Sequence, residues 1–258
     1  MSQIGNKFEA LVEIVEKLRS EDGCPWDIEQ TAESLLPYFI EEVHEVIEAI
    51  DEKDWDLVKE ELGDVMLHLI FQALIANEKN KFGIEDTIEF VNKKLVKRHP
   101  HVFGDDRVDG TFHAKQNWEQ AKHKEKKRKS RIEGVPKTLP SIIQSQRIQQ
   151  KASYAGFDWE DSDDVWKKIG EEIEELKIAQ KNGDKQQIEN ELGDVIFSVV
   201  NLARFLDISA ENALRLTNKK FIKRFIYIEN ALEKSGKKFE DSSLVELDQI
   251  WNQAKDQE

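Results

Sequence analysis

The sequence predicts an all-α protein made of two related helical repeats. It has only 5 Pro and 12 Gly in 258 residues, and Glu, Lys, Leu and Ile recur at helical spacing. Little of the chain is therefore suited to sheet. Several short motifs occur twice in the same order, which indicates an internal duplication. With 39% hydrophobic residues, the chain can bury one large core or two small ones.

The duplicated motifs locate the repeats. Residues 41–45 read EEVHE and residues 61–64 read ELGD; they return as EEIEE at 171–175 and ELGD at 191–194, so both offsets (171 − 41 and 191 − 61) are 130. A basic motif and a tryptophan motif return in the same order, at Lys94, Lys97 and Arg98, then Lys220, Lys223 and Arg224, and at Trp118 and Trp251. A charged run before Gly134 and Pro136 is typical of a linker. We predict an N-terminal repeat over residues 1–132 and a C-terminal repeat over residues 133–258.

Helices can be placed within each repeat. In the first, we expect helices near residues 4–19 and 34–50, and a third that begins after Asp54 as N-cap. In the second, Asp184 and Gln187 resemble a capping box. The third helix of each repeat is apolar, and we expect it to be the buried centre of a bundle. The residues expected there are Val65, Leu67, Leu69, Ile70, Leu74, Val195, Phe197, Val199, Val200 and Leu202.

The acidic residues fall into pairs on helix faces. Glu42 and Glu45 are three residues apart, as are Glu61 and Asp64, so each pair shares one face. The turn near Lys53 lies midway between Glu45 and Glu61, so the two helices should fold into a hairpin with the acid pairs at the same level. At 1.5 Å per residue, both pairs then stand roughly 10 Å from the turn and face each other. The second repeat has the same arrangement around Gly183, with Glu172, Glu175, Glu191 and Asp194.

Four clustered carboxylates favour a divalent cation. Without a counter-ion, acids within roughly 4 Å repel by a few kcal/mol per pair at an effective dielectric near 20. Oxygen-only sites suit Mg²⁺, with Mn²⁺ as a second choice, and Mg²⁺ is commonly shared with substrate phosphates. A lone ExxE is ordinarily solvated, but these acids lead directly into the most apolar helices. Gly63 and Gly193 inside those helices indicate either a close approach of backbone or ligand, or tight packing beneath the metal.

The ordered motifs resemble the MazG family of nucleoside triphosphate pyrophosphohydrolases. Besides EExxE and ExxD in each half, the resemblance rests on GCPWD at residues 23–27, KRHPHVF at 97–103 and GFDW at 156–159. The carboxylate pattern alone is shared with dimeric dUTPases and phosphoribosyl-ATP pyrophosphatases, whereas the ordered set is specific and spans the chain. The resemblance implies hydrolysis of a (deoxy)nucleoside triphosphate to the monophosphate and pyrophosphate, serving nucleotide-pool cleaning or regulation. It also implies a homodimer that completes sites resembling four-helix bundles.

The resemblance also implies residue roles. In the C-terminal repeat, Glu172, Glu175, Glu191 and Asp194 would bind Mg²⁺, and Glu171 would be a supporting group or base. Phosphates would be held by Lys220, Arg224, Lys223 and Lys168, the base would contact Trp251, and Asn218 would bond the sugar or base. The N-terminal repeat has corresponding acids in Glu41, Glu42, Glu45, Glu61 and Asp64 and corresponding cations in Lys94, Lys97 and Arg98. Gln187 and Asn190 depart from relatives that carry a lysine and an acid there.

The bulk charge limits the partners. The formal charge of −14 disfavours nucleic-acid binding, so the cations expected to bind nucleoside triphosphates must act locally. A single cysteine, Cys24, fits a reducing compartment. The N-terminal helix lacks the apolar region of a signal peptide or membrane anchor, so we expect a cytoplasmic protein.

Three alternatives remain at this stage. A relative of narrower specificity, such as a dUTPase, would share the carboxylate pattern. Glu41-x-x-His44 has the spacing of a di-iron bundle, although the second repeat carries Glu174 in place of the histidine. A non-catalytic nucleotide-binding scaffold would explain the bundle but not the clustered acids.

Overall fold

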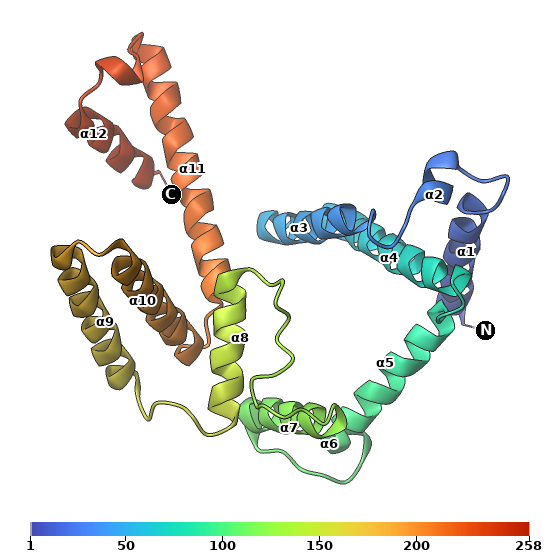
Figure 1. Cartoon of the computed structure of the whole chain (residues 1–258). Helices are drawn as coiled ribbons and strands as arrows, with labels where there is room; N and C mark the ends of the chain where they lie inside the picture. Colours follow the sequence, from blue (N-terminus) through green and yellow to red (C-terminus); the bar gives the residue numbers. More distant parts are fainter. Residues whose placement is uncertain (1, 258) are drawn as a thin grey trace. The chain divides into compact units, whose positions relative to one another are not determined.

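The fold is all-α, as predicted (Figure 1). The structure is a computed structural model that describes residues 2–257, and no strand occurs in that range. None of its helices is both long enough and apolar enough to cross a membrane. The elements in chain order are α1 (Gln3–Leu18), α2 (Pro25–Glu29), α3 (Leu36–Glu52), α4 (Trp55–Glu78), α5 (Ile84–Arg98), α6 (Pro100–Phe103), α7 (Gly110–Glu125), α8 (Ser141–Tyr154), α9 (Ser162–Asn182), α10 (Lys185–Phe205), α11 (Ala210–Ser235), the 3₁₀ helix η1 (Phe239–Asp241) and α12 (Leu244–Lys255).

The chain forms two compact units, Met1–Val108 and Asp109–Glu258. Helix α7 belongs to the second unit because its buried Glu119 pairs with α8. The Glu119 carboxylate lies 2.8 Å from Lys151 Nζ and 3.4 Å from Arg147 Nη2. Burial opposes the charge of Glu119, but the Lys151 hydrogen bond and nearby cations lower its pKa overall. The boundary between the two units, after Val108, therefore lies before the predicted boundary between the two repeats, after residue 132. The repeat boundary stays a prediction.

Each unit contains an antiparallel helical hairpin that carries the predicted acids, α3 with α4 and α9 with α10 (Figure 1). The left-handed residues that end α3 and α9 are Lys53, at φ 59°, and Gly183, at φ 74°. Asp54 then caps α4 by accepting from two backbone N–H groups at 3.1 Å, as predicted. Asp184 caps α10 in the same way, but the described residues show no reciprocal bond from Gln187, so the capping box is incomplete.

The cores lie on one face of each hairpin. In the first unit, Val15 of α1 and Leu35 pack against Ile70, Phe71 and Leu74 of α4. In the second, Val165 and Ile169 of α9 pack against Leu202 of α10. The predicted burial of Ile70, Leu74, Val200 and Leu202 is confirmed. The prediction is wrong for Leu69 and Val199, which are exposed because no described residue of their own unit covers those faces of α4 and α10. It is also wrong for Phe197, which is exposed and lines a cavity between α8, α9 and α10.

Candidate metal and nucleotide sites

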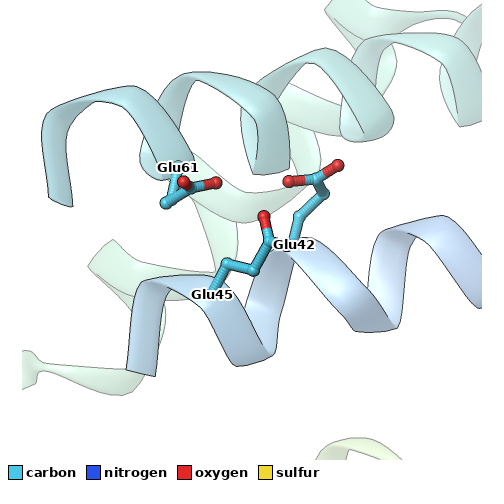
Figure 2. A group of neighbouring side chains, drawn as sticks. All are labelled: Glu42, Glu45 and Glu61. Carbon is cyan, nitrogen blue, oxygen red and sulfur yellow. The ribbon is translucent and has the colours of Figure 1, made fainter. Parts of the chain in front are cut away.

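The first hairpin brings three predicted acids together (Figure 2). Glu42 and Glu45 extend from α3 and Glu61 from α4, with their carboxyl groups in the space between the helices. One oxygen from each lies within 4.8 Å of the others. We call these three residues the N-terminal acid cluster. Its oxygen-only ligand set is the kind that Mg²⁺ and Mn²⁺ prefer.

The pKa values in this cluster show the cost of placing acids together. Burial, followed by the charges of Glu45, Asp64 and Glu61, raises the pKa of Glu42 to about 7. Burial and a hydrogen bond with Glu45 also raise the pKa of Glu61. Without a cation, the group is therefore partly protonated near neutral pH. A divalent ion would favour the charged form of these carboxylates against both the burial and the repulsion that raise their pKa values.

The second hairpin repeats the arrangement. Glu172 and Glu175 of α9 and Glu191 of α10 also have oxygens within 4.8 Å of one another, and we call them the C-terminal acid cluster. Burial, then the charges of Glu172 and Glu191, raises the pKa of Glu175. Lys168, one turn before Glu172 on α9, lies 2.7 Å from it, so this cluster has a cation of its own.

The fourth predicted acid of each set stands slightly apart. Asp64 and Asp194 fall outside the two groups of close carboxylates. The charge of Asp64 still contributes to the raised pKa of Glu42, and Asp194 lines the same cavity as Glu172. Of the predicted supporting acids, Glu41 is exposed, and Glu171 accepts a 2.9 Å hydrogen bond from Lys168.

The other predicted phosphate ligands lie on different helices from the acids. Lys220, Lys223 and Arg224 are on α11, with the two lysines exposed and the Arg224 guanidinium 5.4 Å from the ring centre of Trp251. Asn218 is exposed on the same helix. On α5, Lys94 and Lys97 are accessible, whereas the repeat-related Arg98 is buried. The fold of the described chain thus groups the acids with Lys168 but keeps the α11 and α5 cations on separate elements.

Sequence reasoning missed two features beside the acids. His68 of α4 places Nε2 3.9 Å from Glu42, and burial lowers its pKa. The histidine singled out by spacing, His44, is instead exposed. The second feature is a cavity beside the C-terminal acid cluster, built by α8, α9, α10 and the loop between α8 and α9. Tight packing within the chain does not explain Gly63 and Gly193. A Cβ added at either position would meet no neighbouring residue of the described chain within 4 Å.

Comparison with known proteins decides the family. The sequence profile of the MazG nucleotide pyrophosphohydrolase domain matches twice, at residues 30–103 and 161–226. The chain belongs to the MazG family. Each MazG match spans one hairpin with its acid cluster, so the duplicated geometry and the duplicated MazG domain coincide.

Full-length relatives support the same assignment. The chain is 48% identical, over 99% of its length and 98% of the relative's, to the nucleoside triphosphate pyrophosphohydrolase/pyrophosphatase MazG of Thermotoga maritima. It is 37% identical, over 98% of both chains, to the nucleoside triphosphate pyrophosphohydrolase of Escherichia coli K12. It also resembles the uncharacterized protein YabN of Bacillus subtilis, at 42% identity over 98% of this chain and 52% of YabN.

Proposed function

We propose that this protein is a nucleoside triphosphate pyrophosphohydrolase that uses Mg²⁺ held by its acid clusters. The reaction adds water across the anhydride bond between the α- and β-phosphates and releases a nucleoside monophosphate and pyrophosphate. The observation that carries the proposal is the pair of three-glutamate clusters, one in each MazG domain. Family membership and the full-length pyrophosphohydrolase relatives support the reaction class.

The residues present fit a divalent metal. Burial first, and then the charges of neighbouring carboxylates, raise the pKa of Glu42 and of Glu175, and a bound divalent cation would offset both effects. The ligands would be Glu42, Glu45, Glu61 and Asp64 in one repeat and Glu172, Glu175, Glu191 and Asp194 in the other. When bound, Mg²⁺ would polarise the phosphate and lower the pKa of a coordinated water. Mn²⁺ is expected to substitute.

Protein groups would orient the substrate and move the proton. Glu171 and Glu172, or Glu41 and Glu42 in the first repeat, can accept a proton from the attacking water. Lys168 would bind a phosphate oxygen, and its proximity to the acids supports this role, since its Nζ lies 2.9 Å from Glu171 and 2.7 Å from Glu172. We propose that Asn218, Trp251 and three cations of α11 make further contacts to the nucleotide; the cations are Lys220, Lys223 and Arg224. Lys94, Lys97 and Arg98 would make the corresponding contacts in the first repeat.

We further propose a homodimer. Helix α4 leaves Leu62, Met66 and Leu69 exposed, and α10 leaves Leu192, Ile196 and Val199 exposed. These positions differ by 130 in every case, so both hairpins leave the same apolar stripe uncovered. Packing this stripe against a second hairpin would bury it and complete a four-helix bundle. A second copy of the chain supplies that hairpin.

A coupled phosphate assay tests the function. The protein is incubated with Mg²⁺ and a panel of ribo- and deoxyribonucleoside triphosphates, with and without an added inorganic pyrophosphatase. Phosphate that appears only when the pyrophosphatase is present identifies pyrophosphate as the product. Phosphate without the coupling enzyme would show cleavage at the γ-phosphate instead, and no phosphate in either arm would favour a non-catalytic scaffold.

The same panel separates a broad enzyme from a dUTPase-like one, because the latter would hydrolyse a single deoxynucleotide. Omitting Mg²⁺, then restoring Mg²⁺ or Mn²⁺, tests the metal. Metal analysis of the purified protein addresses the di-iron alternative. The cytoplasmic location stays a prediction, which subcellular fractionation of the source cells would check.

A further inference from the structure

We propose that the cavity beside the C-terminal acid cluster receives the base of the nucleotide substrate, and that Ser198, Asn201 and Trp159 decide whether a base can enter. This inference rests on the proposed function and adds a binding site to it. The cavity has a volume of about 430 Å³, within the range of small-molecule sites. Its residues come from 148–204, all in the second unit.

The position of the cavity points to the substrate as its occupant. Glu172, Asp194 and Lys168, which we assign to metal and phosphate, also line its wall. A nucleotide whose phosphates reach the acid cluster therefore has an adjoining space for its nucleoside. The rest of the wall is mostly apolar, with Val165 and Phe197 among the lining residues, as a flat base requires.

The cavity also offers stacking and hydrogen-bonding groups. Phe157 is 83% exposed and Trp159 is 41% exposed, and both line the cavity, so their ring surfaces are accessible for stacking on a base. Asn201 accepts a 2.9 Å hydrogen bond from Arg204 Nε through its carbonyl oxygen, which leaves its amide N–H groups as donors. Arg204 is held in turn by Asp158, 2.9 Å from Nη1. The polar groups are thus oriented before a ligand binds.

The duplication provides an internal comparison. Subtracting 130 from Ser198 and Asn201 gives His68 and Phe71 in the N-terminal repeat. His68 and Ser198 are both 8% exposed, so these two positions differ in side-chain size and not in burial. Phe71 is 4% exposed and part of the hydrophobic core of its unit, whereas Ser198 and Asn201 line the cavity. The N-terminal repeat therefore places larger side chains where the C-terminal repeat has the cavity wall. The two repeats share acids but differ in room for a base.

The decisive experiment places the side chains of His68 and Phe71 at the equivalent positions of the C-terminal repeat. In the full-length protein, Ser198→His with Asn201→Phe should close the cavity without touching an acid. Binding is measured by calorimetry with Mg²⁺ for a non-hydrolysable nucleoside triphosphate analogue and, separately, for inorganic triphosphate. Mn²⁺ binding is measured by electron paramagnetic resonance. We expect at least about a tenfold loss of affinity for the nucleotide, with unchanged affinity for inorganic triphosphate and Mn²⁺.

A milder variant guards against misfolding. Trp159→Ala removes one partly exposed aromatic and should weaken nucleotide binding by about fivefold or more, while Trp166→Ala, an exposed tryptophan outside the cavity, should not. Trp251→Ala is the parallel test of the base contact inferred from family resemblance. The inference is overturned if the filled-cavity variant folds and binds the nucleotide as the wild type does. Equal losses for nucleotide and inorganic triphosphate, or no effect of Trp159→Ala, would also overturn it.

The two proposals fail in different ways. If the wild type binds nucleotide through this cavity but releases no pyrophosphate, the proposed function is wrong and the base site stands. If the wild type releases pyrophosphate and the cavity variants behave normally, the base site is wrong and the function stands.

Discussion

Lys168 Nζ lies 2.7 Å from Glu172 Oε1, whereas the equivalent position in the N-terminal repeat, 168 − 130, is Tyr38. The C-terminal acid cluster therefore includes a cation from its own helix that the N-terminal cluster lacks at this position. Hydrogen bonds from Lys168 to Glu172 and Glu171 raise the lysine pKa, so its charge persists at any physiological pH. In the other repeat, burial and neighbouring acids raise the pKa of Glu42 to about 7.

Lys168→Met should impair catalysis more than folding. In the proposed reaction the lysine would orient Glu172 and provide a charge for a phosphate oxygen, and loss of one such charged donor should lower turnover by about a hundredfold. The measurement is pyrophosphate release at saturating Mg²⁺. Lys167→Met is the matched control, because Lys167 is exposed and pairs with Asp164 away from the cluster. Equal losses in both variants would contradict a specific role.

Paired glutamine variants should show which repeat turns over. Glu172→Gln with Glu175→Gln should abolish hydrolysis in the C-terminal site and leave helical content intact, since the native acids repel one another without metal. Glu42→Gln with Glu45→Gln asks the same of the N-terminal site. Each pair is assayed for pyrophosphate release and by circular dichroism. Full activity in the first pair would assign the reaction to the N-terminal repeat.

Much of the fold and the acid sites could be predicted from the sequence because their determinants are local. The spacing of Glu42, Glu45 and Glu61 around a turn at Lys53 predicts a helical hairpin with facing acids, and the structure has both. The duplication doubles the information, since each expectation about the acids can be checked at an offset of 130.

The cavity could not be predicted, because it depends on contacts between distant segments. Phe157 lies in a loop and Asn201 near the end of α10, and no periodicity links them. A comparison of the repeats does carry a signal, as Ser198 and Asn201 replace His68 and Phe71, but its meaning appears only in three dimensions. The exposure of Leu69 and Val199 was missed for a related reason: apolar periodicity shows that a face is to be buried, not whether the same chain buries it.

The metal-free protein should lose stability as pH rises from about 5 to about 8. Glu42 has a raised pKa of about 7 in the folded state, so the folded protein holds a proton that the unfolded chain releases near its ordinary value of 4.5. The favourable contribution is complete below 4.5 and is lost as the pH passes 7. Melting temperature in EDTA measures this effect. Glu42→Gln should flatten the dependence of melting temperature on pH, and added Mg²⁺ should reverse its sign. Glu13→Gln, a control at an exposed position of α1, should leave this dependence unchanged.

Leu192→Glu should break the proposed dimer. Leu192 belongs to the stripe that both hairpins leave exposed, and a charge there would have to be desolvated in the interface. If Leu192 is central to the interface, the dissociation constant of the dimer, measured by sedimentation equilibrium, should rise about thirtyfold or more.

Ile178→Glu is the control for this test. Ile178 is also exposed, but the equivalent position of the N-terminal repeat, 178 − 130, is Glu48, so it lies outside the stripe that the repeats share. The control should sediment as the wild type does. If the wild type is monomeric at all concentrations, or if both variants dissociate equally, the shared stripe is not a dimer interface. The completion of a four-helix bundle around each metal site would then need the two hairpins of a single chain.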